Sequence, residues 1–233
     1  MRLPMENEQN KFEVLRPAVT VAILMIILML IASAFVWQKL PGDARVAVHW
    51  NIAGQPDRYG SKFQGLMLMP LVTVAMMIVM VIVPLIEPRY RHIKSSMKAY
   101  NIILSAIVLL MAFLHLILLM AALGEPINIM KSVCLGIGLL FILIGNYSGK
   151  IRSNFFIGIK TPWTLSSELS WHKTHRLVSR LFIILGMAIG LSGLFLPGMI
   201  VFVILLCGVA GLLAAVTLYS YFVWKKDPHK KSL

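Results

Sequence analysis

The sequence predicts an all-α integral membrane protein with about six transmembrane helices and both termini in the cytoplasm. Three observations lead to this prediction. Hydrophobic residues make up 59% of the 233 residues and charged residues only 13%, against about 25% charged residues in an average soluble domain. Six apolar runs are long enough to cross the hydrocarbon core of a bilayer, which takes roughly 20 residues of helix. The Lys and Arg residues, finally, fall mainly in alternate loops.

The six spans are found by counting apolar residues between polar interruptions. Only Leu196-Pro197-Gly198 separates the fifth span from the sixth, and a Pro-Gly turn of this length predicts an antiparallel helical hairpin. The whole chain, residues 1–233, is expected to form a single polytopic membrane domain. In chain order, the predicted spans are Ala18–Trp37, Leu66–Ile86, Ile102–Leu123, Ile129–Gly145, Leu181–Leu196 and Met199–Trp224.

Near its end, the first apolar run contains Ala32-Ser33-Ala34, which resembles a signal-peptidase site. The run continues through Phe35-Val36-Trp37, however, and acidic residues precede it among the basic ones. We therefore expect the first span to be an uncleaved membrane anchor.

The positions of Lys and Arg predict the orientation, because cytoplasmic loops carry an excess of these residues. Of the 22 residues, 17 lie in the N-terminal segment, the second and fourth loops and the C-terminal tail. The other five lie in the first loop and at the start of the fourth span. Both termini and residues 146–180 are therefore expected in the cytoplasm, and residues 38–65 outside the cell. With a net charge of +13, the cytoplasmic face is expected to contact anionic membrane lipids, and no direct contact with nucleic acid is expected.

Composition and motifs exclude several other classes of protein. A disulfide-stapled secreted domain is excluded because both cysteines, Cys134 and Cys207, lie inside apolar runs, where we expect buried thiols. The sequence has no nucleophile–base pair, phosphate-binding glycine loop or cofactor motif, so neither an enzyme nor a cofactor is expected. The scarcity of charged residues inside the spans argues against ion-coupled transport.

One ionisable residue, His115, lies near the middle of the third span. An ionisable group at this depth is by default a candidate for a functional role. A neutral histidine that is hydrogen-bonded to a neighbouring carbonyl oxygen or to Asn128, Ser105 or Ser192 is at least as good an interpretation.

Small residues recur at helical spacing in the last two spans. Gly186 and Gly190 form such a stripe in the fifth span, and Cys207, Gly211 and Ala215 form one in the sixth. Stripes of this kind allow two helix backbones to approach closely. Because a tight turn joins the two spans, we expect them to pack on each other, with homo-oligomerisation through the same faces as the alternative.

In the first loop, residues 38–65, turn-forming residues surround a short segment that favours extended backbone, Val46-Ala47-Val48. His49-Trp50-Asn51 follows this segment. One interpretation is a tryptophan that anchors the membrane interface and an asparagine that starts a turn. The other is contact with an extracellular ligand. A metal site at His49 would have only Asp43 and Asp57 as partners in this loop, so no metal is expected.

Residues 146–180 form the longest polar segment, and a helix is predicted to begin within it. Thr161 is a suitable N-cap and Pro162 a suitable first helical residue. The helix is expected to continue as an amphipathic segment into the fifth span, with Trp163 and Trp171 at the depth of the membrane interface. Its basic residues would then face lipid phosphates or water; they are Lys173, Arg176 and Arg180.

Two further interpretations concern the same segment. Glu168 and His172 are four residues apart and His172 and His175 three apart, so each pair can share a helix face. The His-Glu-x-x-His pattern of zinc proteases is absent, which favours an ion pair between Glu168 and His172 over a metal site. Alternatively, a docking surface for a cytoplasmic protein is formed by Lys160, Trp171, His175 and Arg176.

Both loops resemble the SdpI family of bacterial membrane proteins. The first loop resembles the N-terminal extracellular-loop domain of unknown function in that family, through Leu40-Pro41, His49-Trp50-Asn51, Gly54, Pro56-Asp57 and Lys62. The inner segment resembles the C-terminal signature of the family, through Gly145-Asn146, Asn154, residues 158–166, Trp171 and Thr174-His175-Arg176. The sequence departs from the family pattern at Ala47, Lys160 and Val178-Ser179.

The resemblance implies a membrane protein that gives immunity to a secreted hydrophobic peptide toxin, the sporulation-delaying peptide, and that holds an ArsR-type repressor at the membrane when it senses the toxin. It implies toxin sensing by His49, Trp50, Asn51 and Asp57. It also implies repressor docking, or maintenance of the active conformation, by Asn146, Asn154, Lys160, Thr161, Pro162, Trp163, Trp171, His175 and Arg176. The alternative function is a small envelope transporter or exporter of a peptide or lipid.

Overall fold

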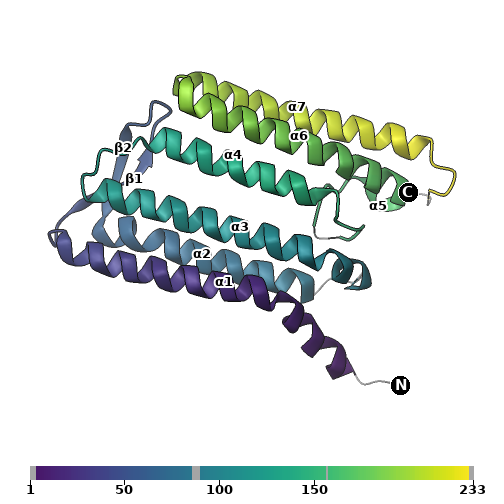
Figure 1. The fold of residues 1–233 in the computed structure, drawn as a ribbon, viewed down its shortest axis with the longest axis horizontal. Coiled ribbons are helices and arrows are strands. Elements are labelled where there is room, and N and C mark those ends of the chain that lie inside the picture. Colours follow the sequence, from purple (N-terminus) through teal and green to yellow (C-terminus); the bar gives the residue numbers. More distant parts are fainter. Residues whose placement is uncertain (1–3, 86–89, 156, 231–233) are drawn as a thin grey trace.

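The computed structural model describes residues 4–85, 90–155 and 157–230, which are mainly helical (Figure 1). Apart from α5, each helix in these residues is long and apolar enough to cross a membrane, which gives six candidate spans and confirms the predicted fold class. The elements are α1 (Pro4–Lys39), β1 (Arg45–Trp50), β2 (Pro56–Ser61), α2 (Lys62–Leu85), α3 (Tyr90–Ala122), α4 (Ile129–Ser148), α5 (Pro162–Ser166), α6 (Glu168–Phe195) and α7 (Gly198–Lys225).

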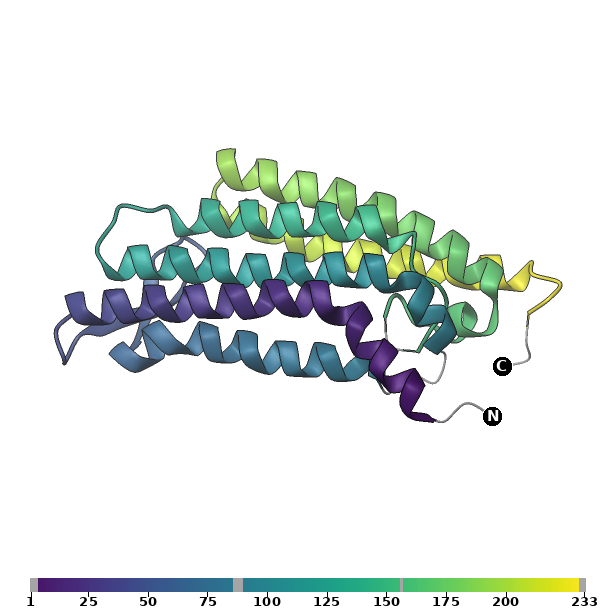
Figure 2. The same cartoon turned by 60° about the horizontal axis from the view of Figure 1, so that its bottom comes forward.

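The six long helices lie side by side in two groups of three (Figures 1 and 2). Helices α1, α2 and α3 pack together, α4, α6 and α7 pack together, and α3 contacts α4 where the groups meet. The hairpin end of the bundle carries β1, β2 and the α6–α7 turn, and the opposite end carries α5 and residues 149–161. We call this opposite end the loop end. Helix α1 begins and α7 finishes at the loop end (Figure 2).

Ser33 and His115 are hydrogen-bonded to each other where α1, α2 and α3 meet. The Ser33 hydroxyl donates to the Leu66 carbonyl oxygen at 2.7 Å, so it accepts from His115 Nε2 at 2.9 Å. The same Nε2 lies 3.3 Å from the carbonyl oxygen of Met29, and His115 is only 1% exposed. His115 is therefore a buried, hydrogen-bonded histidine. Its partners are on α1: the Met29 carbonyl oxygen agrees with the expected carbonyl partner, and Ser33 takes the place of the expected Asn128, Ser105 or Ser192.

The glycine stripe of α6 packs against α4 and not against α7 as chain order suggested. A Cβ atom added to Gly138 of α4 would lie 2.7 Å from the Gly186 carbonyl oxygen and 3.0 Å from Gly190 Cα. Only glycine allows the two backbones to approach so closely, because an ordinary side chain would keep them further apart.

The packing of α7 differs from the expected small-residue stripe. Helices α6 and α7 do contact each other, but a Cβ atom on Gly211 would meet no described atom within 4 Å. Cys134 is buried, as expected, whereas Cys207 is exposed on α7. Cys207 and Gly211 therefore lie on the apolar outer surface of α7 and pack against no other helix in the described residues.

The first loop is a β-hairpin. The extended segment expected at Val46-Ala47-Val48 lies in β1, which pairs antiparallel with β2. The sequence did not predict β2, because Pro56-Asp57 indicated a turn. The tip of the hairpin packs on the other half of the protein: Gly54, with φ +78°, lies against Met130 of α4, and Gly198 lies so close to the Ile52 carbonyl oxygen that a Cβ atom would overlap it.

The contact of α4 with α6 predicts that Gly138→Ala destabilises the protein. The added methyl group collides with α6 backbone, and overpacking of this kind costs about 1–3 kcal/mol. Gly211→Ala is the matched control, because its methyl group has free space. Thermal unfolding of both variants in detergent should show a lower melting temperature only for Gly138→Ala. Equal melting temperatures would contradict the assigned contact.

Candidate functional site

The predicted helix start at Thr161 is confirmed, but the continuous helix into the fifth span is wrong. Thr161 and Thr164 form a capping box, with Pro162 at the first helical position. Helix α5 then ends at Ser166, and the extended backbone of Ser167, with φ −142° and ψ 116°, separates it from α6. The Ser167 hydroxyl accepts from the Ser170 N–H at 2.9 Å and so caps α6. Because serine side chains compete for backbone N–H groups, a Ser-Ser pair favours such a break.

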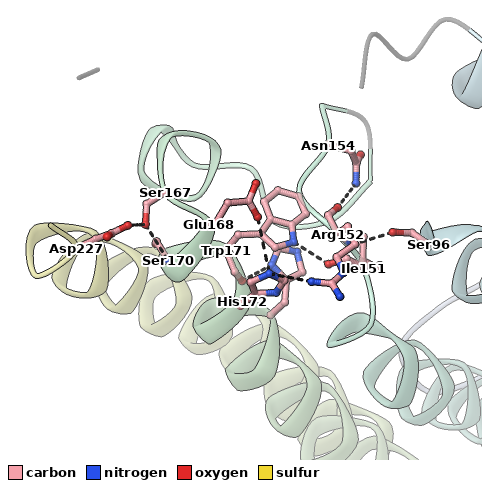
Figure 3. Close-up of polar contacts among 11 residues, drawn as sticks. Ser96, Ile151, Arg152, Asn154, Ser167, Glu168, Ser170, Trp171, His172 and Asp227 are labelled. Atoms are coloured by element: carbon pink, nitrogen blue, oxygen red, sulfur yellow. Dashed lines mark hydrogen bonds and ion pairs between the residues drawn. The ribbon is translucent and has the colours of Figure 1, made fainter. Parts of the chain in front are cut away.

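Two aromatic residues of α6 are buried at the loop end. Trp171 is 0% and His175 is 1% exposed, and their rings stack with centroids 4.2 Å apart. The indole Nε1–H of Trp171 donates to the Ile151 carbonyl oxygen at 2.7 Å (Figure 3). Trp171 therefore packs inside the protein, and its predicted depth at the membrane interface stays a prediction. Because both rings lie inside the protein, neither can belong to an exposed docking surface in this conformation.

Both ring nitrogens of His175 are used. Nδ1 lies 2.9 Å from the Trp171 carbonyl oxygen, so it carries the proton and donates. Nε2 therefore accepts the N–H of Ile159 at 3.1 Å. Gly158, with φ +112°, brings the loop against the two rings, and a Cβ atom there would overlap His175. Only glycine fits this position, because its positive φ is unfavourable for other residues and because a side chain would collide with His175.

Asn154 holds the same loop together from inside. It is 0% exposed, its Nδ2 donates to the carbonyl oxygens of Arg152 at 2.8 Å and Ile157 at 3.1 Å, and its Oδ1 accepts the Ile157 N–H at 2.6 Å. The Arg152 N–H donates to Ser96 Oγ of α3 at 2.8 Å. The loop-end cluster, which we define as Ile151, Asn154, Gly158, Trp171 and His175, therefore joins both groups of helices.

Helix α7 borders the same site. Ser170 donates to the Ser220 carbonyl oxygen at 2.8 Å, and Thr161 Oγ1 lies 3.2 Å from Ser220 Oγ. The ring of Trp163 meets that of Tyr221 edge-on, with centroids 5.3 Å apart. Trp163 therefore packs on α7, and its side chain is half-exposed.

Beyond α7, the chain returns to the start of α6. The Ser167 hydroxyl donates to Asp227 Oδ2 at 2.5 Å and the His229 N–H donates to Oδ1 at 2.9 Å. These two hydrogen bonds, that from Ser167 first, hold the pKa of the Asp227 carboxyl below its ordinary value. Sequence analysis missed Ser167, Ser170, Ser220 and Asp227. The one available signal was that Asp227 is the single acidic residue in a basic C-terminal tail.

The remaining predicted residues of the inner motif are exposed. Asn146, Lys160, Pro162 and Arg176 lie at the surface, outside the loop-end cluster. The predicted contact between Glu168 and His172 is present, with 3.8 Å between Oε2 and Nε2. Across the described residues, no group of three or more His, Cys, Asp or Glu side chains is placed to hold a metal ion.

At the hairpin end, Asn51 starts the turn, which confirms one of its two interpretations. Its Oδ1 accepts the N–H groups of Ala53 at 2.9 Å and Gln55 at 3.0 Å. His49 Nδ1 contacts Asp57 Oδ1 at 2.6 Å, with both side chains exposed, and Trp50 is half-buried. All four residues predicted for toxin sensing, His49, Trp50, Asn51 and Asp57, therefore lie on the hairpin. The side-chain oxygen of Asn51 already accepts the hydrogen bonds that form the turn.

Six candidate spans joined by a folded hairpin and a folded loop define a multi-pass cell membrane protein. Residues 150–220 match the model of the SdpI/YfhL protein family, and residues 24–74 match that of a domain of unknown function, DUF1648. The immunity protein SdpI of Bacillus subtilis (strain 168) is 27% identical over 209 residues, which cover 88% of this chain and 95% of that protein. These matches confirm the predicted resemblance to the SdpI family. No solved structure matches it.

The fit of Gly158 against His175 predicts that Gly158→Ala loosens the loop. Gly124→Ala is the matched control, because Gly124 also has positive φ, +84°, but has free space for a methyl group. We expect Gly158→Ala to lower the free energy of unfolding by about 1–3 kcal/mol more than Gly124→Ala does. It should also accelerate hydrogen exchange at the amides of Ile157 and Ile159. Similar exchange in the two variants would show that the loop does not depend on this contact.

The hydrogen bonds of Asp227 predict a pH-dependent contribution to stability. Because the folded-state pKa is lowered, this contribution is complete above the ordinary aspartate pKa, about 3.9, and is lost as the pH falls through the folded-state pKa. At pH 7, Asp227→Asn should melt about 2–4 °C below wild type, and the difference should shrink towards pH 3. Asp43→Asn, at an exposed position, should leave the melting temperature unchanged at pH 7. A difference that does not shrink at all between pH 7 and pH 3 would refute this origin.

Proposed function

We propose that this protein is a membrane immunity protein that protects the cell from a secreted hydrophobic peptide toxin and reports the toxin from the hairpin end to the loop end. Similarity to the immunity protein SdpI supports the immunity role. The observation that carries the proposed signal is the contact of the hairpin tip with the α6–α7 turn, because the same two helices build the loop end.

The orientation in this proposal follows from charge. The N-terminal segment, residues 87–101, residues 146–180 and the C-terminal tail carry 17 of the 22 Lys and Arg residues, so the positive-inside rule favours the cytoplasm for the loop end. The hairpin then faces the outside, where a secreted peptide arrives.

The hairpin end offers a surface that suits a hydrophobic peptide. Tyr59 on β2 and Phe63 at the start of α2 are 49% and 57% exposed, next to the exposed His49–Asp57 pair on the two strands. Exposed aromatic rings beside polar groups are common in binding surfaces. We assign toxin sensing to this region, including Trp50, with Asn51 as the residue that shapes the tip.

Transmission to the other end requires a stiff connection. The hairpin tip touches the α6–α7 turn at Gly198 and the start of α4 at Met130. Helix α6 is locked to α4 through close glycine contacts, so a shift of the tip acts on both helices together. The far end of α6 carries Trp171 and His175, which hold the 149–161 loop. A displaced helix therefore changes the loop.

At the loop end, residues of the inner motif divide into two roles in this proposal. Buried Asn154, Trp171 and His175 maintain the loop conformation. Lys160 and Arg176 are exposed, and we propose that an ArsR-type repressor contacts this surface from the cytoplasm. A partner that recognises the loop would then respond to toxin without contact with the buried rings.

The alternative, a small exporter of a peptide or lipid, is favoured by one observation. An apolar recess of about 270 Å³ lies between α3 and α4, lined by residues such as Leu110, Phe113 and Leu139. Such a recess could hold an apolar segment of cargo. An exporter would lower the amount of cell-bound toxin, whereas the proposed immunity protein would leave toxin bound at the cell.

Expression in a toxin-sensitive bacterial strain tests the immunity role. Cells that carry the chain should survive exposure to the sporulation-delaying peptide. Asn51→Ala and Gly198→Ala, which both disturb the contact of the hairpin tip, should return survival close to that of cells without the protein. Gly211→Ala should protect like wild type. Membrane levels of each variant are compared by immunoblot. Full protection by both tip variants would refute the proposed route, and no protection by wild type would refute the immunity role.

A further inference from the structure

A basic recess lies at the loop end, beside the loop-end cluster. It encloses about 360 Å³ between the end of α4 and the first turns of α6, and its lining comprises Gly149, Lys150, Ile151, Arg152, His172 and Arg176. Three of these six residues have cationic side chains, and the described lining includes no carboxylate. The nearest acidic group on α6 is Glu168, whose Oε2 lies 3.8 Å from His172 Nε2.

The position of Arg152 is built into the fold. Its N–H donates to Ser96 and its carbonyl oxygen accepts from Asn154, so its backbone is held on both sides. Its Nη1 lies 3.3 Å from His172 Nε2 (Figure 3). A guanidinium has five N–H donors, so the other donors of Arg152 remain for a ligand.

The other two cations come from different elements. Arg176 follows His172 by one helical turn, which places both on the same face of α6. Lys150 lies just after α4, and its ammonium group sits 4.3 Å from the centre of the Tyr147 ring. Cations from a loop and from a helix thus converge on one recess, an arrangement that suits an oxyanion with several oxygen atoms.

The length of α4 places the basic recess at the depth of lipid headgroups and so indicates which oxyanion it meets. Helix α4 has 20 residues, which corresponds to about 30 Å of helix, the thickness of the hydrocarbon core. Residues 149–152 follow its last turn, so they lie at the depth of lipid headgroups. Phosphate groups of phospholipids are therefore the oxyanions present at the recess in highest concentration.

We infer that this recess binds the phosphate of an anionic phospholipid headgroup, with Arg152 and Arg176 as its principal ligands. Arg is suited to this role because its planar guanidinium pairs with two phosphate oxygens at once. The bound headgroup bridges the 149–161 loop and α6, and thereby stabilises the loop-end cluster beside it. This inference does not depend on the proposed immunity function.

Thermal unfolding of the full chain in detergent tests the inference, with dihexanoyl-phosphatidylglycerol as the probe. The wild-type melting temperature should rise saturably with this lipid. In Arg152→Gln/Arg176→Gln, the half-saturating concentration should rise about tenfold or more. Lys173→Gln/Lys226→Gln is the matched control, because it also removes two exposed positive charges but neither residue lines the recess. It should titrate like wild type.

Three results would overturn the inference. Equal weakening in the two double variants would indicate diffuse surface charge and no defined site. An equal rise with dihexanoyl-phosphatidylcholine would refute selectivity for an anionic lipid. A saturable rise of the same size with inorganic phosphate alone would assign the recess to a free oxyanion instead of a lipid.

Discussion

Residues 149–155 and 157–161 form irregular backbone at the edge of a membrane-spanning bundle, where peptide N–H and C=O groups need partners. Side chains from α6 and from the loop itself supply these partners. Trp171 donates to the carbonyl oxygen of Ile151, His175 accepts the N–H of Ile159, and Asn154 pairs with the Ile157 peptide groups on both sides. The basic recess, the start of α6 and the contact with α3 all depend on a loop held in this way.

The position of α6 relative to α4 is the second constraint. Glycines on both helices let the backbones approach so closely that a single methyl group would collide. Dispersion forces between closely packed backbones are a main source of helix association in lipid, where the hydrophobic effect is weak. Helix α6 is therefore fixed along α4, and the loop-end cluster at its start is fixed with it.

These constraints link the two ends of the molecule. The hairpin tip rests on the α6–α7 turn, and α6 and α7 both extend to the loop end, where Ser170 and Ser220 tie them together. A membrane protein that reports an outside event needs such a continuous path with two arrangements. The proposed immunity function uses this path, and an anionic headgroup in the basic recess would stabilise one of its ends.

The sequence by itself determined the six spans, the turn between α6 and α7, the N-cap at Thr161 and the turn at Asn51, because each depends on local composition or on contacts within a few residues. Only the tertiary structure shows that Trp171 and His175 are buried and that the glycines of α6 face α4. It also shows two hydrogen bonds that the sequence does not indicate, between Ser33 and His115 and between Ser167 and Asp227. These pairs are separated by tens of residues or lie on different helices. In an apolar span every helix face has similar hydrophobicity, so periodicity cannot show which face meets protein and which meets lipid.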